Sequence, residues 1–326
     1  MRRSLSLIPL VVLLAVLTGV PLPLFEVGPG PAREVEPLIH VRGPEVFDSA
    51  GRFLLTTVTV SRATSFEAVR GWFDRSIDIV PERDVLPPGI TEQENDEIQL
   101  SEMDASKLAA AYVTLQRVSG YPADHRPGAL VQDVFPDFPA DGRLFPGDLV
   151  LEANGEPVAG RAALAAAIRR AGADGRLTLT VRAGGETRTV VVRPVRAEGV
   201  DHAVIGVSLI DNFPFSLSIE SGDIGGPSAG LMWALGLSDL LTPGDLAGGR
   251  VIAGTGTIDL DGAVGPIGGI EQKVVAAARA GADVFLVPRR DLAGARAVVD
   301  GLELVPVDTY ADALAYLFSG CRCDRF

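Results

Sequence analysis

Two glycine-rich breaks, each followed at once by a helical stretch, divide the last third of this chain. The first break, Gly222–Gly226, comes after a strand-like segment at residues 213–219 and before an apolar run at residues 231–241. Glycine-rich segments stop strands and helices, so this order predicts a strand, a tight loop and a helix. Ser228 falls beside the predicted start of that helix. Free backbone N–H groups and the positive helix end can stabilise an oxyanion there.

The second break, residues 265–269, precedes helix formers that run from Ile270 to Ala280. Lys273 shares one face of this predicted helix with aliphatic residues, because they follow the three-four spacing of a helix. Only two of the 29 basic residues are lysines. Arginine stays protonated, whereas a lysine whose pKa falls by about three units through burial is neutral enough to act as a base. Ser228 and Lys273 together therefore predict nucleophilic hydrolysis of a peptide bond.

Other interpretations of these two residues stay open. A helical lysine often packs its stem and leaves its ammonium in water, and a serine after a Gly-Pro turn can simply cap a helix. Residues 226–230 also match G-x-S-x-G of α/β-hydrolases, but the histidine of that fold follows the serine. Here His40, His125 and His202 all precede it. A histidine base in another chain order is the remaining triad alternative.

Three motifs carry a resemblance to a known family. They are Gly-Pro-Ser-Ala-Gly at residues 226–230, Gly-Thr-Gly-Thr-Ile at 254–258 and Gly-Pro-Ile-Gly-Gly-Ile-Glu-Gln-Lys at 265–273. Their order and spacing over roughly the last 120 residues resemble the proteolytic domain of Lon-type serine peptidases. The resemblance implies an α+β fold of the ribosomal protein S5 domain 2-like type. It also implies that Ser228 is the nucleophile, that Lys273 is the general base, and that copies of the chain form rings.

The resemblance further implies a set of oxyanion and supporting residues around the serine. These are Gly226, Pro227, Ala229 and Thr255, and Thr255 is expected to hydrogen-bond within the dyad. The family often has an acidic residue directly before Gly-Pro-Ser, where this chain has Gly225.

A second compact unit is predicted upstream, at residues 119–196. Its strand-like segments, a hairpin signal at Asn154-Gly155 and a helix-like stretch at residues 161–170 give a β-rich pattern that resembles a bacterial PDZ domain. Such domains bind an extended peptide as an added strand, so the resemblance implies a peptide ligand. The binding loop is expected near Gly120 and Tyr121. A structural β-module with a filled groove is the alternative.

The region between the start of the chain and this unit, residues 28–118, is predicted to pair partly with the protease domain. Strand-like segments at 38–41 and 53–60 are similar to the opening hairpin of Lon-type proteolytic domains, so the PDZ-like unit is expected to be inserted into the protease fold. Helices are expected at 67–74 and 105–118, with a solvated acidic loop at 92–97. The protease domain proper is drawn at 197–320, and a tail with Cys321 and Cys323 at 321–326.

The first residues suggest a location. Arg2 and Arg3 precede a largely apolar stretch, residues 5–25, about long enough to cross a bilayer. A signal anchor or transmembrane helix is therefore predicted at residues 1–27, with the catalytic part on the extracytoplasmic side of the cell membrane. Removal as a signal peptide is the competing interpretation, although no clear A-x-A cleavage site follows.

Charge and motifs exclude several function classes. A net charge of −13 disfavours nucleic acid as a partner, and there is no G-x-x-x-x-G-K-[ST] phosphate loop for ATP-driven unfolding. No cofactor or metal site is predicted. The expected function is a membrane-anchored, ATP-independent Ser/Lys endopeptidase that cleaves unfolded or flexible polypeptides and uses its PDZ-like unit to bind substrate or a partner. The alternative is a non-catalytic PDZ-type peptide-binding scaffold that keeps the protease fold.

Overall fold

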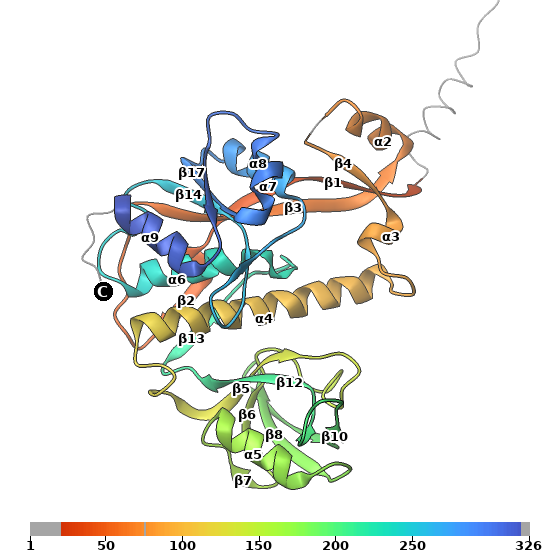
Figure 1. The fold of residues 1–326 in the computed structure, drawn as a ribbon, viewed down its shortest axis with the longest axis vertical. Helices are drawn as coiled ribbons and strands as arrows, with labels where there is room; N and C mark the ends of the chain where they lie inside the picture. The colour runs from red at the N-terminus through yellow and green to blue at the C-terminus, as the bar shows by residue number, and fades with distance from the viewer. Residues whose placement is uncertain (1–20, 75, 321–326) are drawn as a thin grey trace, which may run out of the picture.

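The structure, a computed structural model, describes residues 21–74 and 76–320 (Figure 1). Strands from both ends of the sequence share one six-stranded sheet, in the order β18-β17-β14-β3-β1-β4. β3 pairs parallel with β14 and antiparallel with β1, so the N-terminal region and the C-terminal region form a single domain. The strands are β1 (Pro21–Glu34), β3 (Arg52–Thr64), β4 (Asp78–Pro81), β14 (Val251–Gly254), β17 (Val284–Pro288) and β18 (Glu303–Val307).

Helices cover both faces of this sheet because its central strands are apolar on both sides. Phe53 and Leu55 of β3 belong to the core shared with α6, whereas Leu54 between them belongs to the core shared with α7. The helix α4 lies beyond α6, where Thr114 donates a hydrogen bond from its hydroxyl to the Ala234 carbonyl at 3.0 Å. The helices are α4 (Glu92–Val118), α6 (Gly230–Leu241), α7 (Ile270–Arg279), α8 (Leu292–Arg296) and α9 (Tyr310–Gly320).

A second, antiparallel sheet with its own apolar core forms the PDZ-like domain, at the lower end of Figure 1. The chain enters it after α4 and returns to the first domain at β13 (Ser216–Ile219), which pairs with β2 (Ile39–Arg42). The second domain is therefore inserted between two elements of the first domain, α4 and β13. Its main elements are β5 (Arg126–Val134), β6 (Leu149–Ala153), α5 (Arg161–Ala171), β8 (Leu177–Ala183), β9 (Glu186–Val192) and β12 (Val207–Asn212).

Three sequence predictions need correction. Residues 92–97 are not a loop but the start of α4, because Thr91 and Glu94 form a capping box there. The predicted boundary at 196/197 lies too early, since β12 pairs with β5 and extends the inserted domain to residue 212. Residues 21–27 of the predicted anchor belong to β1, and residues 1–20 lie outside the described part of the chain.

Among the helices of residues 21–74 and 76–320, none combines the length and apolar character needed to span a bilayer. The predicted tail with Cys321 and Cys323 also lies outside the described residues. The remaining elements are short: η1 (Glu36–Leu38), α2 (Ser65–Gly71), α3 (Glu82–Val85), β7 (Glu156–Pro157), β10 (Val195–Arg196), β11 (Ala203–Val204), η2 (Pro227–Ala229), β15 (Thr257–Ile258), β16 (Val264–Gly265) and η3 (Arg289–Asp291).

A half-buried carboxyl group beside the start of β3 makes the stability of the fold depend on pH. Glu36 accepts a hydrogen bond from the Phe53 N–H at 3.0 Å, and burial raises the pKa of Glu36 to about 7. Because the folded pKa exceeds that of the unfolded chain, the protonated group contributes stability below about pH 4.5, and this contribution is lost as the pH rises through 7. We expect Glu36→Gln to raise the midpoint of thermal unfolding at pH 8, on the order of 5 °C, with little change at pH 5. An equal shift at both pH values, or the same shift in the exposed control Glu198→Gln, would contradict this explanation.

Candidate active site

Ser228 lies in the short helix η2, at the end of a tight loop that leads from β13 towards α6. Gly226 before it has φ of +82°, a backbone conformation that side chains disfavour, and an added Cβ would lie 2.9 Å from Oε1 of Gln99. The Gly226 N–H donates to the Gln99 carbonyl at 2.7 Å, and the Ser106 hydroxyl donates to the Pro227 carbonyl at 2.9 Å. Helix α4 therefore holds the serine loop in place from outside.

Lys273 lies in the first turn of α7, which begins after the left-handed residue Gly269. Lys273 is only 4% exposed. Its Nζ donates a hydrogen bond to Oγ of Ser228 at 2.6 Å and to Oγ1 of Thr255 at 3.4 Å. Two residues that are 45 positions apart in sequence thus meet at hydrogen-bonding distance.

Thr255 fixes the main chain of the serine rather than its hydroxyl. Its Oγ1 donates to the Ser228 carbonyl at 3.0 Å, and the Gly256 N–H donates to the same oxygen at 2.7 Å. Two donors on one carbonyl hold the Ser228 peptide in a single orientation. The hydroxyl of Ser228 is then free to face the amine.

Burial lowers the pKa of Lys273 to about 8, and the nearby Asp291 carboxylate acts in the opposite direction. Asp291 is itself held in place, since its Oδ2 accepts a hydrogen bond from the Ile267 N–H at 3.0 Å. At this pKa about a tenth of the molecules carry a neutral amine at pH 7, instead of about one in 10³ for an unperturbed lysine. A neutral amine in contact with a hydroxyl can accept its proton.

The predicted oxyanion and supporting residues do not all serve the same purpose. The N–H of Gly226 is bound to Gln99, and Pro227 has no N–H, so neither offers a donor to a substrate oxygen. Both instead shape the loop. Ser228 and Ala229 lie in the first turn of η2, where backbone N–H groups have no acceptor within the helix.

A cleft of about 250 Å³ opens beside the dyad. Its lining includes the strand segment 55–58 of β3, the loop segment 223–225, Met103 of α4 and Arg33 of β1. A cleft between a strand and a loop suits an extended chain better than a folded surface.

Each of the three histidines contacts a group other than Ser228. His40 lies 3.4 Å from the Glu220 carboxylate, His125 lies 2.9 Å from the Arg126 carbonyl oxygen, and His202 lies 2.8 Å from Asp201. The group within reach of the Ser228 hydroxyl is therefore a lysine, and the histidine-triad alternative has no geometric support.

The structure does not support the predicted peptide-binding loop at Gly120 and Tyr121. Tyr121 is only 3% exposed, and its hydroxyl donates to the Asp211 carbonyl at 2.7 Å. The Tyr121 ring packs edge-on against the rings of Tyr112 and Phe213, so Tyr121 is part of the packed interface between the two domains.

An apolar groove of about 250 Å³ lies elsewhere on the PDZ-like domain, between α5 and β12. Ala165 and Ile168 line it from α5, and Gly206, Val207 and Leu209 line it from the other side. In the described sheet β12 is the end strand, paired only with β5. A free strand edge beside an apolar helix is the arrangement that accepts an added peptide strand.

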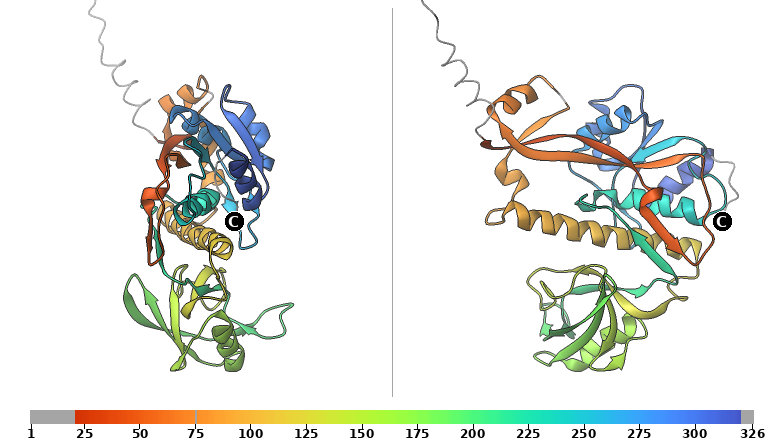
Figure 2. Two further views of the ribbon diagram at one scale, coloured as in Figure 1. Left: turned by 90° about the vertical axis from the view of Figure 1, so that its left-hand side faces the viewer. Right: turned by 180° about the vertical axis from the view of Figure 1, so that it is seen from behind.

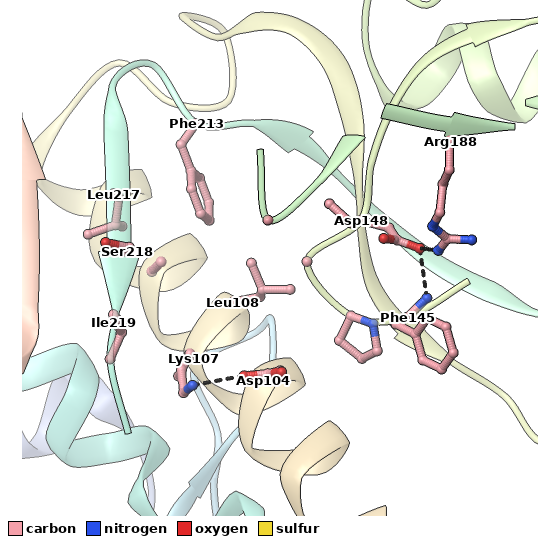
Figure 3. Close-up of a pocket in the computed structure, with 15 residues that line it drawn as sticks. Asp104, Lys107, Leu108, Phe145, Asp148, Arg188, Phe213, Leu217, Ser218 and Ile219 are labelled. Carbon is pink, nitrogen blue, oxygen red and sulfur yellow. Dashed lines mark hydrogen bonds and ion pairs between the residues drawn. The ribbon is translucent and has the colours of Figure 1, made fainter. Parts of the chain in front are cut away.

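A larger cleft, about 420 Å³, lies between the two domains (Figure 3). Lys107 and Leu108 of α4 face the Phe145 loop and Arg188 of the inserted domain across it, with β13 along one side. Its charged groups pair with each other, Lys107 with Asp104 at 2.8 Å and Arg188 with Asp148 at 2.6 Å. Helix α4 separates this cleft from the dyad, because Met103 and Ser106 of the same helix contact the catalytic side.

The sequence interpretation missed Gln99 and Ser106. Both residues lie on α4 and support the serine loop through its main chain. The signal that could have placed Gln99 on a helix is the pair Thr91 and Glu94, a capping-box spacing at the start of α4.

Two families of known proteins match separate parts of the chain. Residues 215–320 match the family described as the Lon protease (S16) C-terminal proteolytic domain, and residues 104–193 match the PDZ domain family. The Lon protease of Desulfosudis oleivorans is 39% identical over 118 residues, which cover 35% of this chain and 14% of that protein. The Lon protease of Phenylobacterium zucineum is 34% identical over 170 residues, covering 48% of this chain and 21% of that protein.

Among solved structures, the PDZ domain of an SdrC-like protein from Listeria monocytogenes is 21% identical, with a TM-score of 0.24. The match covers 25% of this chain and 86% of the solved chain. The chain spans about one seventh of the length of the first Lon proteases that it matches. The C-terminal part of the chain is thus a serine peptidase domain of the Lon type, and the inserted part is a PDZ domain.

Proposed function

We propose that the chain is an ATP-independent serine endopeptidase in which Ser228 is the nucleophile and Lys273 is the general base. The observation that carries this proposal is the buried amine, which lies 2.6 Å from the serine hydroxyl and has a pKa lowered to about 8. A structural ion pair would need a carboxylate at that distance, and the partner here is a hydroxyl.

In the proposed mechanism, neutral Lys273 takes the hydroxyl proton of Ser228 as Oγ attacks the scissile carbonyl carbon. The oxyanion that forms is stabilised by N–H groups in the first turn after Gly226, a type of contact worth about 10²–10³ in rate. The Lys273 ammonium then returns the proton to the departing amine, which leaves an acyl group on Oγ. Water then gives a proton to Lys273 as its oxygen attacks the ester carbonyl carbon. The bond between that carbon and Oγ breaks, the Lys273 ammonium returns the proton to Oγ, and the acid product leaves with both residues restored.

We propose flexible or unfolded polypeptides as substrates, because the dyad cleft lies between a strand and a loop. The test is hydrolysis of an unfolded casein by the full chain without ATP, beside a tightly folded globular protein at the same concentration. We expect fragments from the casein alone. Equal cleavage of both proteins, or a requirement for ATP, would contradict the proposed substrate class.

The pH dependence of this hydrolysis should report the amine. Since the base must be neutral, we expect kcat/KM to rise with pH along a limb centred near 8. Asp291→Asn removes the negative charge that favours the ammonium, so its limb should move to lower pH. Asp300→Asn, an equal change of charge at an exposed position, should leave the limb in place. A limb that stays put in Asp291→Asn would assign the titration to another group.

We propose the groove between α5 and β12 as the peptide site of the PDZ domain, because it combines apolar walls with a free strand edge. Ala165→Trp should fill the groove and weaken binding of a fluorescent apolar peptide with a free C-terminus by at least about tenfold. Ala162→Trp adds the same ring at an exposed position of α5 outside the groove and should bind normally. Equal binding by both variants would place the peptide elsewhere.

We also propose that the chain is anchored in the cell membrane by its N-terminal segment, with the catalytic part on the extracytoplasmic side. The support is Arg2 and Arg3 before the apolar stretch of residues 5–25. A protease added to intact cells should digest a C-terminal tag on the full chain, and protection of the tag until the cells are broken would reverse the proposed orientation. Association of several copies of the chain stays a prediction. Measuring the mass of the detergent-solubilised protein would test it.

A further inference from the structure

The most exposed large apolar side chains of the described residues lie together at α2. Trp72 is 90% exposed, Phe73 84%, Phe66 59% and Val69 54%. We call these four residues the α2 aromatic patch. Phe66 and Val69 lie one helical turn apart on α2, and Phe73, in the turn after the helix, lines the same surface pocket as these two side chains. A tryptophan is rarely this exposed on a soluble surface, so the patch indicates a contact with something apolar.

The patch lies where the N-terminal segment joins the folded domain. Thr64, the last residue of β3, pairs with Pro21, the first described residue of β1, and α2 begins at the next position after Thr64. Figures 1 and 2 show α2 beside the start of β1, at the end of the molecule opposite the PDZ domain. The apolar residues 5–20 of the sequence immediately precede this point.

The helix is braced so that its apolar face points outward. Arg70 forms an ion pair with Glu26 of β1. An added Cβ at Gly71 would lie 2.7 Å from the Ile79 side chain, so the other face of α2 packs closely on β4. Phe66 and Val69 lie on this helix. Trp72 and Phe73 lie in the turn that follows it, where the Trp72 N–H donates to the Val69 carbonyl at 3.2 Å and the Phe73 N–H donates to the Arg70 carbonyl at 3.0 Å.

We propose that the α2 aromatic patch docks into the headgroup and acyl boundary of a lipid bilayer. The inference rests on the proposed membrane anchor and deepens it. Tryptophan and phenylalanine favour this boundary, and a tether beside the patch supplies a high local concentration of lipid, so a weak contact is sufficient. Four side chains offer roughly 600 Å² at most, less than the roughly 800 Å² that each partner usually contributes to a stable protein interface. A bilayer therefore fits the patch better than a second copy of the chain.

Docking at two points would orient the enzyme. The anchor fixes one end of β1, and the patch would stop the domain from swinging about that end. The PDZ domain would then face away from the membrane, because it lies at the opposite end of the molecule from α2.

The two tryptophans of the chain provide the test, since Trp233 is fully buried and serves as an internal reference. The full chain is reconstituted into phosphatidylcholine and phosphatidylglycerol vesicles, with and without bromine on the acyl chains. We expect bromine to quench the Trp72 component of the emission, and Trp72→Phe to remove all the quenching. Quenching that persists in Trp72→Phe, or no quenching in the wild type, would overturn the proposal.

Flotation of the vesicles separates this proposal from the anchor. Wild type and the double variant Trp72→Ser, Phe73→Ser should both float if the N-terminal segment anchors the chain. Flotation without quenching of Trp72 would reject the patch and keep the anchor, whereas no flotation would reject both.

The position of the Trp72 emission separates the other occupants. A blue shift of Trp72 that grows with protein density and is insensitive to bromine would assign the patch to a second copy and overturn lipid docking. A blue shift that is independent of density and insensitive to bromine would assign it to residues 1–20 and overturn lipid docking as well.

Discussion

Replacement of Ser228 by alanine is expected to lower kcat/KM for an unfolded polypeptide by about 10³-fold or more, which is about 4 kcal/mol of transition-state stabilisation. The change removes the attacking Oγ and leaves the Ser228 carbonyl with its donors from Thr255 and Gly256. The loop should therefore keep its shape while the covalent step is lost. The measurement is release of casein fragments under single-turnover and steady-state conditions.

Ser218→Ala is the matched control for this prediction. Ser218 lies on β13 in the same segment of the chain, is exposed, and lines the interdomain cleft instead of the dyad cleft. It should retain full activity. Undiminished cleavage by Ser228→Ala would reject the assignment of the nucleophile. A wild-type chain that binds peptide at the PDZ groove yet cleaves nothing would favour the non-catalytic scaffold.

Local sequence patterns sufficed for the parts of this site that depend on neighbours in the chain. The glycine-rich breaks predicted the loop before α6 and the start of α7, and helical spacing predicted that Lys273 lies on an apolar face. The structure buries that face against β1 and β3, and this burial lowers the pKa of the amine. The resemblance to Lon-type domains, carried by the same motifs, also agrees with the family match over residues 215–320.

The support of the loop by α4 could not be predicted in this way. The contact between Gln99 and Gly226 joins residues far apart in the chain, and an acidic stretch before Gln99 has the composition of a surface loop. Only the capping pair at Thr91 and Glu94 shows locally that these residues are helical.

The groove proposed here for the peptide could not be predicted from the sequence for a related reason. The sequence interpretation put the binding loop before the first strand of the PDZ domain. In the structure the free edge belongs to β12, the last strand of that domain, and the free edge depends on long-range pairing of β12 with β5. The alternation of apolar and polar residues within one segment does not specify which other strand it pairs with. The sequence pattern therefore predicted the strands but not their order in the sheet.

Replacement of Lys273 by arginine is expected to be as damaging as removal of the serine, with a loss of about 10³-fold or more at every pH. Arginine keeps the positive charge and the length of the side chain but does not deprotonate, so it cannot take the proton of Oγ. The limb near pH 8 should disappear with the activity. Lys273→Met, which fits the buried site without a charge, should be equally inactive and at least as stable to heat, since it removes the cost of burying an amine.

The only other lysine of the chain supplies the control for this change. Lys107 pairs with Asp104 at 2.8 Å on the far side of α4, outside the dyad cleft. Lys107→Arg preserves that ion pair and should cleave casein at the wild-type rate with the same pH limb. Activity in Lys273→Arg that still rises through pH 8 would show that another group serves as the base. Loss of activity in Lys107→Arg would indicate that the interdomain cleft, which Lys107 lines, takes part in cleavage.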